Sequence, residues 1–574
     1  MAYGSEGIAV VLQKHPWDGT LVWWQNELSE CREELAMQEI CVDRKEFKVI
    51  REMGGVYVDK TKHIYDIFGR GLYYFLARPR RFGKSLLCTT LRALFRGERE
   101  LFKDLWIDSS DWNWQKYPVL YFDMSFASSK TGTAETVRKG IINMLKDNAE
   151  KLGITDLELK TPALMFEQLI NKTKDITGQN VVVIIDEYDK PLLDVIDEGQ
   201  RYKEIHQEIS DFYSQLKPAE ERLRFVFITG VFKFTQTSIF SGLNNLKDIT
   251  LSAKAGELLG YTEQEIRHFF AEHLSVLASE CELPVEEMII RLRNQYNGYR
   301  FGVHTGSKKL SSGVYNPYAL NYVFNDFELI DKWFASGSPT AMIKKLTKDG
   351  FSGFVAEHLK VAFNTLNTSC SPDGMTSLST LYYAGYITMH ECYEDKTGDE
   401  PVTMLKLDFP STEVRNAYAK NLLPELLQKN FEEVNQFASC IKDIFREQKL
   451  ADLHELFNDL LSTTTYEIFT RSHDKLPKEN FYQVAFHCLF IVANFRTVME
   501  DSTNRGRIDI SVELPDVVYL FELKMNESAA TAIQQIKDTD YPRKFKLTNR
   551  TVYGIGVSID KETRTVTELL WEIL

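Results

Sequence analysis

Three short apolar runs in the first half of the chain contain no charged residue. They are Leu72–Leu76, Val181–Ile185 and Phe225–Ile228. A run of this kind is typical of a strand that is covered on both faces of a parallel sheet. Polar residues follow each run closely. We therefore predict an α/β fold in which polar side chains gather along one edge of the sheet, where such folds bind ligands.

The pattern near the C-terminus is different and predicts a β-hairpin between two helices. Ile508–Glu513 alternates apolar and polar residues, Leu514–Asp516 is a turn signal, and Val517–Lys524 is a second strand. The second strand is mostly apolar, which favours a covered position inside a sheet. Apolar helical patterns begin at Glu479 before the hairpin and at Ala532 after it.

Mainly helical patterns lie between these two regions. Turn-rich segments interrupt them at 304–313 and 369–374, and an amphipathic pattern predicts a helix from Glu425 to Phe445. We predict five segments: an extension at 1–45, an α/β domain at 46–255, a helical lid with a small helical or winged-helix extension at 256–415, a helical linker at 416–475, and a second α/β domain at 476–574.

The composition is that of an ordinary globular protein. Of 574 residues, 44% are apolar and 26% are charged, and a chain of this length forms several cores. No apolar run is long enough to span a bilayer, and the N-terminus lacks a basic-then-apolar signal. We therefore expect a cytoplasmic protein with no membrane partner. The eight cysteines form no Cys-x-x-Cys pair, which argues against a zinc site or a disulfide framework.

The net charge of −14 argues against a protein that coats nucleic acid without specificity. Basic residues nevertheless crowd the C-terminal segment, where they form either a solvated face or a local contact surface for a phosphate backbone. They are Arg505, Arg507, Lys524, Lys537, Arg543, Lys544, Lys546 and Arg550.

The loop after the first apolar run has the second half of a phosphate-binding loop. In such a loop Gly83 lets the backbone approach phosphate, Lys84 reaches the β and γ oxygens, and the Ser85 hydroxyl binds magnesium. The N-terminal amides of the following helix complete the anion site. Arg78 stands where the standard pattern has its first glycine. Gly-Lys-Ser alone occurs by chance in many chains, so its partner residues decide the prediction.

The other two apolar runs end in residues that suit the same site. Asp186 can orient the magnesium shell, Glu187 can polarise water for attack on the γ-phosphate, and Thr229 is placed like a sensor of that phosphate. The alternative interpretation is that these are turn residues after core strands. We predict a site for ATP and Mg²⁺ in which Ser85 and Asp186 hold the metal.

The predicted hairpin carries a second group of chemically active side chains. Glu522 and Lys524 are two positions apart on one strand and share a face, and we expect Asp509 to face them from the partner strand. Two carboxylates and an ammonium can hold Mg²⁺ and activate water against a phosphodiester. The same spacing occurs on solvated strand faces, but charged residues are rarely buried in an apolar strand without a partner or a metal.

Both groups lie in motifs that resemble a bacterial family in which an AAA-ATPase-like domain is fused to a PD-(D/E)XK nuclease domain. The hairpin resembles the nuclease signature, with Ile508 in place of the usual proline. In that family the loop RPRRFGKS is the usual form, so Arg78 is no sign of a lost site. The other matching motifs are YVDKT at 57–61, IIDEYDKP at 184–191, ITGV at 228–231, LLGYTEQEI at 258–266, YNGYRF at 296–301, VYNPYAL at 314–320, SGSPT at 336–340 and FPSTEVR at 409–415.

The resemblance implies a fold for the whole chain and a set of nucleotide-binding residues. The implied fold is a P-loop NTPase domain with a parallel sheet, a helical lid and extension, and a C-terminal α/β restriction-endonuclease-like domain. Arg300 in the lid either reaches a nucleotide phosphate or stabilises a turn. The implied nucleotide-binding residues are Arg81, Gly83, Lys84, Ser85, Asp186 and Thr229.

The resemblance also extends the site on the hairpin. It implies that Glu479, at the start of the preceding helix, joins Asp509 and Glu522 at the metal. A Glu in that place also simply suits the helix dipole. Similar nucleases carry a Gln near the site in the following helix, which implies a role for Gln535.

Three functions are compatible with these features. The first is an ATP-regulated, Mg²⁺-dependent nuclease whose partner is nucleic acid, with DNA expected, and the family association suggests defence against foreign DNA. The second is a signalling ATPase whose C-terminal domain binds nucleic acid or protein without cleaving it. The third, an ATPase acting on protein partners, leaves the hairpin unexplained. The sequence does not decide whether the protein forms a homo-oligomer or needs a partner protein.

Overall fold

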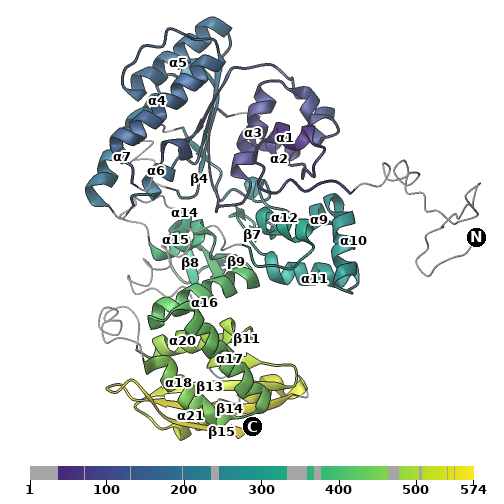
Figure 1. Cartoon of the computed structure of the whole chain (residues 1–574), viewed down its shortest axis with the longest axis vertical. Coiled ribbons are helices and arrows are strands. Elements are labelled where there is room, and N and C mark those ends of the chain that lie inside the picture. The colour runs from purple at the N-terminus through teal and green to yellow at the C-terminus, as the bar shows by residue number, and fades with distance from the viewer. Residues whose placement is uncertain are drawn as a thin grey trace, which may run out of the picture.

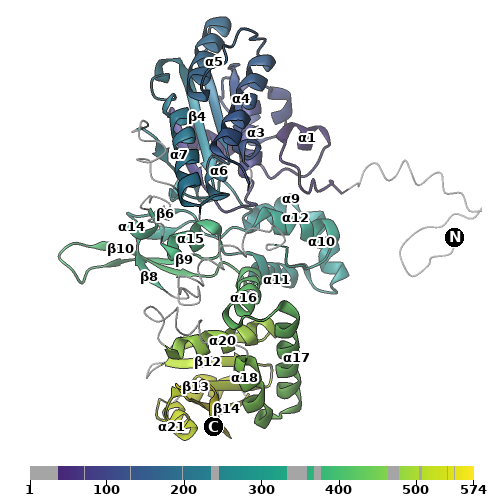
Figure 2. The ribbon, with the colours of Figure 1, turned by 60° about the vertical axis from the view of Figure 1, so that its left-hand side comes forward.

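A computed structural model shows three bodies stacked along one axis (Figure 1). An α/β domain lies at one end, a helical lid and a small sheet lie in the middle, and a second α/β domain lies at the other end (Figure 2). Residues 1–36 of the predicted N-terminal extension lie outside the described part. The structure describes residues 37–69, 71–128, 131–196, 198–233, 243, 245–332, 359–367, 376–462, 478–502, 507–539, 541–548 and 550–574.

The first domain contains the parallel sheet that the apolar runs predict. Its strands are β1 (Tyr73–Ala77), β2 (Val119–Asp123), β3 (Val181–Asp186), β4 (Leu223–Gly230) and β5 (Lys247–Asp248). They lie in the order β2-β3-β4-β1-β5, and every neighbouring pair is parallel. The three predicted strands are β1, β3 and β4, and almost every residue in them is buried. The α/β prediction is confirmed.

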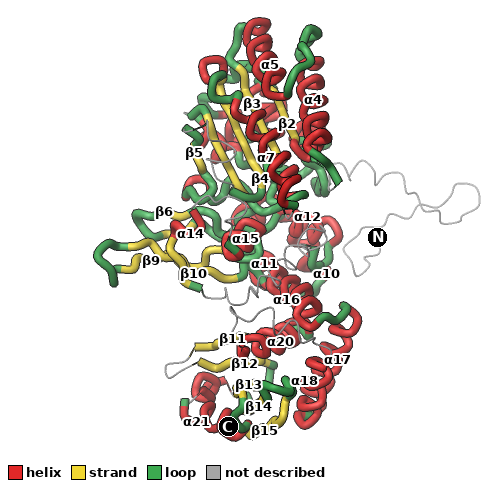
Figure 3. Tube along the Cα trace, turned by 90° about the vertical axis from the view of Figure 1, so that its left-hand side faces the viewer, coloured by secondary structure: helices red, strands yellow, loops and turns green. Residues whose placement is uncertain are grey.

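Helices cover both faces of this sheet, which explains why the strands are apolar throughout. Val182 and Ile184 belong to one buried cluster, and Val183 and Ile185 belong to the other. One face carries α4 (Ala134–Lys151), α5 (Pro162–Thr177) and α7 (Gly199–Ser214), as Figure 3 shows, with the short α6 (Lys190–Leu193) beside them. The other face carries α1 (Phe47–Glu52), α2 (Thr61–Phe68) and α3 (Lys84–Phe95).

The middle body consists of a lid and a small sheet. The predicted helical lid is present as α9 (Glu263–Phe269), α10 (Ala271–Glu280), α11 (Val285–Tyr296) and α12 (Pro317–Asp326), with the hairpin strands β6 (Val303–His304) and β7 (Lys309–Leu310). The extension that follows combines short helices with a three-stranded antiparallel sheet of order β8-β10-β9, so it is not purely helical. Its elements are β8 (Lys360–Ala362), α14 (Phe363–Asn367), α15 (Ser377–Ala384), β9 (Thr388–Asp395) and β10 (Val402–Asp408).

The prediction of a continuous helix from Glu425 to Phe445 is wrong. The linker instead forms α16 (Thr412–Leu427), α17 (Phe431–Glu447) and α18 (Leu453–Ser462). Gln428 ends α16 in the left-handed conformation, with φ 52°. Asn430 then caps α17 in a reciprocal capping box with Glu433. These local end signals outweigh the amphipathic pattern that runs across the break.

The last domain is a mixed sheet between helices. It contains α20 (Lys478–Val492), β11 (Arg496–Ser502), β12 (Arg507–Glu513), β13 (Val517–Met525), α21 (Ala529–Asp538), β14 (Thr551–Ile559) and β15 (Val566–Ile573). The predicted hairpin is β12–β13, and β13 is the central strand of the order β11-β12-β13-β14-β15. Buried side chains of β13 alternate between a cluster shared with α20 and one shared with α21. Within the described residues, none of the helices combines the length and apolar character needed to cross a bilayer.

Candidate nucleotide and nuclease sites

The phosphate-binding loop lies between β1 and α3, as predicted. Gly83 caps α3 in the left-handed conformation, with φ 84°, which glycine adopts at no steric cost. The buried Lys84 ammonium donates to the backbone oxygens of Arg78 at 3.0 Å and Pro79 at 2.9 Å. Burial lowers the Lys84 pKa, and nearby carboxylates oppose that shift. The lysine is therefore folded onto carbonyls of its own loop, which are neutral partners that an anion can replace.

Two carboxylates at the carboxyl edge of the sheet lie near this loop. Asp186 is fully buried at the end of β3, and burial raises its pKa to about 6, while a hydrogen bond from Ser85 lowers it. The structure thus brings together the two residues predicted to hold magnesium. Asp123 is the register partner of Asp186 on β2 and raises its pKa further. Asp123 was missed in the sequence, although it also ends an apolar strand and could have been found by the same rule.

The other predicted residues of this edge have clear positions. Glu187 follows Asp186 with φ 48°, and its amide donates to Asp186 Oδ1 at 2.9 Å. Thr229 is fully buried, and its hydroxyl donates to the Leu76 backbone oxygen at 2.7 Å. That bond joins β4 to β1, so the hydroxyl of Thr229 has a structural partner in this state. Its role as a phosphate sensor, and that of Glu187 toward water, stay predictions.

Asp189 is a second carboxylate that sequence reasoning missed. Its Oδ2 accepts from the amides of Val231 at 2.9 Å and Phe232 at 2.8 Å, in the segment that follows β4. Burial raises its pKa to about 6, and those amide bonds oppose the shift. A Cβ at Gly230 would lie 2.5 Å from Asp189 Oδ1, so the glycine in this motif leaves room for the carboxylate.

The arginines and the phenylalanine of the loop attach it to the lid. The buried Arg78 donates to the backbone oxygens of Thr250 at 2.6 Å and Ala255 at 2.8 Å, and its guanidinium lies 4.4 Å from the Phe301 ring centroid. Burial lowers the pKa of Arg78 to about 10. Arg78 therefore replaces the usual glycine with a structural contact between the loop and the lid.

Two further side chains of the loop reach other parts of the lid. The guanidinium of Arg81 lies 4.1 Å from the Tyr318 ring centroid on α12. The fully buried Phe82 ring packs against Tyr299 and Phe301, with ring centroids 4.7 and 5.2 Å away. Arg300 lies between these two rings in sequence, and its amide donates to Thr388 Oγ1 of β9 at 2.8 Å. Its proposed contact with phosphate stays a prediction.

A cavity of about 80 Å³ lies beside Gly83, between α3, the N-terminal segment and the lid. Its walls are mainly apolar and include residues of the YVDKT and LLGYTEQEI motifs. Lys60 of the first motif bonds to Glu265 of the second at 2.6 Å and so holds the two walls together. Lining residues are Tyr57, Val58, Gly83, Leu87, Leu259 and Tyr261.

The hairpin brings its three predicted residues together. Lys524 Nζ donates to Glu522 Oε1 at 3.0 Å, which confirms that the two share a face. The backbone pairing of β12 with β13 runs from Glu513–Val518 to Ile510–Phe521. Directly beyond it, Asp509 Oδ2 accepts from the Leu523 amide at 2.7 Å. The Asp509 side chain therefore takes the place of the next backbone hydrogen bond between β12 and β13, and this position brings its carboxylate near Glu522.

The electrostatics of this group suit a divalent cation. Glu522 is 1% exposed, and burial followed by the neighbouring Asp509 raises its pKa to about 7. Lys524 opposes the shift but bonds to only one oxygen of the carboxylate. The buried Oε2 of Glu522 has no hydrogen-bond partner in the described part of the chain. An unsatisfied buried oxygen beside a second carboxylate is a donor set of the kind that Mg²⁺ binds, so the residues fit the ion.

The two outer residues of the predicted nuclease site are less defined. Glu479 lies in the first turn of α20, as predicted, but its side chain is outside the described residues. Gln535 lies on α21, which starts at Ala529 rather than Ala532 because Ser528 caps it. Among the residues that the structure describes, no three His, Cys, Asp or Glu side chains form a metal-binding group. The contributions of Glu479 and Gln535 stay predictions.

A buried polar group joins the linker to the nuclease-like domain. Arg415 of α16 lies 3.1 Å from His487 Nε2 of α20 and donates to the Thr497 backbone oxygen of β11 at 2.6 Å. His487 is fully buried, and burial together with Arg415 lowers its pKa well below the usual value. The motif FPSTEVR contains this arginine, but its partners are more than 70 residues away and carry no local signal that points to it.

The fold and these side chains define an ATPase-like α/β domain joined through a lid to a nuclease-like domain. Family models match in the same order: a predicted AAA-ATPase at residues 42–240 and a PD-(D/E)XK nuclease superfamily domain at 477–569. The chain belongs to the family that joins these two domains.

One curated relative matches nearly the whole chain. It is an uncharacterized protein encoded in the vnfD 5′ region of Azotobacter chroococcum mcd 1, 31% identical over 544 residues that cover 94% of this chain and 100% of the relative. Among solved structures, that of the Aeropyrum pernix ORC1 protein in complex with DNA covers 67% of this chain and 94% of its own, at 11% identity and a TM-score of 0.22. A similarity at that level carries no argument.

Proposed function

We propose that the protein is an ATP-regulated, Mg²⁺-dependent nuclease that hydrolyses phosphodiester bonds of nucleic acid, with DNA as the expected substrate. The observation that carries the proposal is the group formed by Asp509, Glu522 and Lys524, with one buried carboxylate oxygen left unsatisfied. A buried polar atom without a partner needs an explanation, and a bound cation supplies one.

In this proposal Asp509 and Glu522 would hold the ion, and the bound ion would supply a Lewis acid for the phosphate and a more acidic water. The ionised Glu522 is the form that binds metal, so protons compete with the ion for this carboxylate and binding should weaken as the pH falls. Lys524 would place its charge against the phosphate and stabilise the negative charge that develops there. Asp509 would keep its orientation through the Leu523 amide.

The nucleotide would occupy the loop and the neighbouring cavity. Lys84 would exchange the two loop carbonyls for phosphate oxygens, while Ser85 and Asp186 would hold Mg²⁺. The cavity beside Gly83 offers apolar walls to the base. Whether ATP is hydrolysed or only bound depends on Glu187, for which a catalytic role is part of the proposal.

Continuous contacts support communication between the two sites. Phe82 in the loop packs on Tyr299 of the lid. The neighbouring Gly298 lies so close to the extension that a Cβ there would be 1.9 Å from the Pro410 oxygen. Helix α16 starts two residues after Pro410, is capped by Ser411 and reaches α20 through Arg415. When Lys84 leaves the Arg78 and Pro79 carbonyls, the phosphate-binding loop would shift. Because Phe82 of that loop packs on Tyr299, the shift would be passed to the lid, to α16 and then to α20.

The decisive test is cleavage by the wild type beside Asp509→Asn. This change removes the charge but keeps an acceptor for the Leu523 amide, so the hairpin should remain folded. Plasmid, single-stranded DNA and RNA would each be incubated with Mg²⁺, with and without ATP. Asp516→Asn, in the exposed turn of the hairpin, is the matched control. Wild-type cleavage that Asp509→Asn abolishes supports the proposal, and cleavage that survives the change contradicts it.

A second function deserves a test because only two acids meet at the hairpin among the described residues. The protein would then be a signalling ATPase whose C-terminal domain binds nucleic acid or protein without cleaving it. In that case binding would survive in EDTA, and no substrate would be cut under any condition. A role in defence against foreign DNA rests on family association alone and stays a prediction.

A further inference from the structure

A large groove lies at the end of the first sheet away from the nucleotide loop. It encloses about 800 Å³, which is within the range of ligand sites in proteins. Tyr74 near the start of β1, Arg224 near the start of β4 and Lys247 at the start of β5 border it, so it is at the amino ends of the strands. The loop with Lys84 follows the carboxyl end of β1, so the groove and the nucleotide site are separate.

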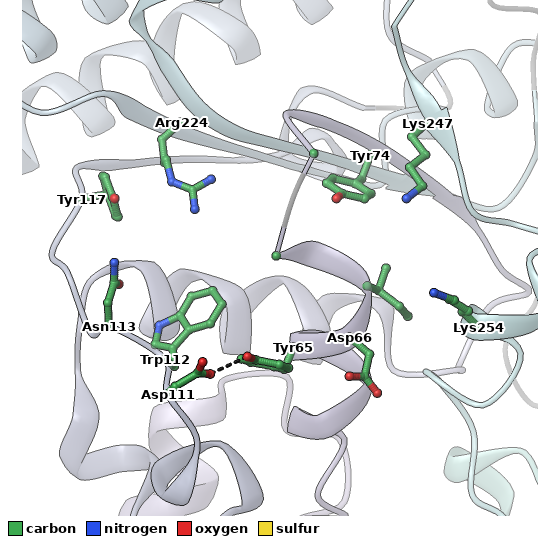
Figure 4. Close-up of a pocket in the computed structure, with 13 residues that line it drawn as sticks. Tyr65, Asp66, Tyr74, Asp111, Trp112, Asn113, Tyr117, Arg224, Lys247 and Lys254 are labelled. Atoms are coloured by element: carbon green, nitrogen blue, oxygen red, sulfur yellow. Dashed lines mark hydrogen bonds between the residues drawn. The ribbon is translucent and has the colours of Figure 1, made fainter.

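Three cations point into this groove (Figure 4). Arg224 and Lys247 extend from the sheet, and Lys254 extends from the 3-10 helix Ala253–Ala255. None of the three forms an ion pair with a carboxylate of the described chain. Arg224 instead lies 5.6 Å from the Tyr117 ring centroid, and Lys247 lies 5.4 Å from that of Tyr74. Three unpaired cations in one groove are notable in a protein whose net charge is −14.

Aromatic side chains form the opposite wall of the groove. Tyr65 of α2 and Trp112, in the loop between the 3-10 helix Trp106–Ser109 and β2, face the cations in Figure 4, and both are partly exposed. Their ring centroids are 6.4 Å apart, and Trp112 is fixed further by Phe95 at 5.9 Å. A tryptophan that is held in place by packing, yet open to solvent, can offer a flat surface to a ligand.

Two carboxylates, Asp66 and Asp111, also line the groove. Their positions restrict where a ligand can carry negative charge, but they do not exclude an anion from the whole groove. The Asp111 carboxylate accepts a hydrogen bond from the Tyr65 hydroxyl, so it fixes the wall. Asp66 lies on the same side as Tyr65, away from Arg224 and Lys247. Arg224 and Lys247 are therefore at one wall together with Tyr117 and Tyr74, and Tyr65, Trp112 and the two acids are at the other. Lys254 lies to one side, between Lys247 and Asp66. A ligand that fits has negative charge on one side and a flat, polar ring on the other.

From this juxtaposition we propose that the groove binds a nucleotide unit, with its phosphate at Arg224, Lys247 and Lys254 and its base against Trp112 and Tyr65. Cations along a groove with aromatic stacking surfaces are the means by which proteins hold unpaired nucleotides. The unit belongs either to a single strand of nucleic acid or to a free nucleotide, which share this chemistry. The inference is independent of the nuclease proposal because the groove lies on the ATPase-like domain.

The test measures binding by the full chain in EDTA, so that no strand is cut. Fluorescence anisotropy would follow a labelled oligothymidine of about twelve nucleotides, a length close to known single-strand sites. Arg224→Ala/Lys247→Ala should weaken binding and reduce its salt dependence, and Trp112→Ala should weaken it about tenfold. Lys62→Ala/Lys103→Ala, which removes two exposed lysines of the same domain, should bind like the wild type.

Crosslinking separates this groove from any binding by the nuclease-like domain. An oligonucleotide with 4-thiothymidine would be irradiated on the protein, and the crosslinked peptides would be mapped by mass spectrometry. Crosslinks at Tyr65, Trp112 or Tyr117 that disappear in Arg224→Ala/Lys247→Ala support the proposal. Crosslinks confined to residues 478–574, or binding that both groove variants leave unchanged, overturn it.

A competition arm identifies the source of the nucleotide. Unlabelled thymidine monophosphate would be titrated against the oligonucleotide on Lys84→Ala protein, so that the phosphate loop contributes little. Competition at similar concentrations of the two ligands identifies a free nucleotide, and strong preference for the oligonucleotide identifies a strand. Binding of a fluorescent ATP analogue by the groove variants with intact Lys84 checks that the domain is folded. If neither ligand binds to folded protein, the inference is wrong.

Discussion

The two lysines at the centre of the two candidate sites are held in different ways. Among the described residues Lys84 donates to two backbone carbonyls of its own loop, whereas Lys524 donates to the Glu522 carboxylate. A carbonyl is a weak, neutral partner that a phosphate can replace, while a buried carboxylate keeps the ammonium in place. In the proposed function, the nucleotide site around Lys84 would therefore change its contacts when a ligand binds, whereas the nuclease site around Lys524 would be assembled before substrate binds.

The acids of the two sites share a different property. Burial raises the pKa of Asp186 to about 6 and that of Glu522 to about 7, and in each case a neighbouring aspartate adds to the shift. Carboxylates that resist ionisation together are stabilised by a cation between them. In the proposed function both groups of carboxylates would gain from a metal, but only the nucleotide site would change the partners of its lysine.

The largest expected effect comes from removing the fixed lysine. Lys524→Ala should lower cleavage by at least about 10²-fold, because it removes a charge aimed at the reacting phosphate. Binding of a fluorescent ATP analogue should be unchanged, since the nucleotide site is in another domain. Lys442→Ala, which removes an exposed lysine on α17 that belongs to neither site, is the control and should cut like the wild type. Full cleavage activity of Lys524→Ala would contradict the assignment of Asp509, Glu522 and Lys524 as the nuclease site.

The second expected effect is on the free energy of unfolding. It tests whether the ionised Glu522, beside Asp509, destabilises the fold when no metal is bound. Glu522 has a folded-state pKa of about 7, above its usual 4.5, so it stabilises the fold while protonated. That contribution is complete below pH 4.5 and is lost as the pH rises through 7, at a cost of at most about 3 kcal/mol. In EDTA, Glu522→Gln should therefore gain stability relative to the wild type between pH 5 and pH 8.

Denaturation by urea at the two pH values measures this difference. Addition of Mg²⁺ at pH 8 should stabilise the wild type and have little effect through this site on Glu522→Gln. Asp186 and Asp189 of the nucleotide site are present in both proteins, so their contributions to the pH dependence of stability cancel in the comparison. If the difference in unfolding free energy between the wild type and Glu522→Gln is the same at pH 5 and pH 8, the pKa of Glu522 is not raised in the folded protein and the prediction is wrong.

The third effect concerns the lysine that is expected to move. Lys84→Ala should weaken ATP binding by about 10- to 100-fold, because it removes a charged hydrogen-bond donor to phosphate. Cleavage without ATP should persist at the basal rate, and any response to ATP should shift to higher nucleotide concentration. Lys103→Ala, an exposed lysine of the same domain, is the control. Equal ATP affinity in Lys84→Ala and the control would place the nucleotide elsewhere.

Much of the fold could be predicted because its signals are local. The apolar runs of β1, β3 and β4 and the alternation in β12 are read directly from neighbouring residues. The break between α16 and α17 was also signalled locally, because Asn430 stands three residues before Glu433 in a capping box. The amphipathic pattern across the break hid that signal.

The parts that could not be predicted depend on contacts between distant segments. Thr229 has the position of a phosphate sensor in sequence, yet its hydroxyl partner is Leu76 on the neighbouring strand. Arg78 reads as a missing glycine, but it holds backbone oxygens that follow β5. No spacing rule reveals such partners, because they are set by the order of strands and the placement of the lid.

The smallest expected effect tests whether the two regions communicate through α16. Arg415→Met keeps much of the side-chain volume but removes the bonds to His487 and the Thr497 oxygen. It touches neither site, so cleavage without ATP and ATP affinity should stay close to wild type. The ratio of cleavage rates with and without ATP should fall about fivefold toward one, at the low end of usual coupling energies. Arg446→Met, which removes the exposed ion pairs with Asp443 and Glu447 on α17, should leave that ratio unchanged. If both variants respond to ATP like the wild type, the two sites communicate by a route other than α16.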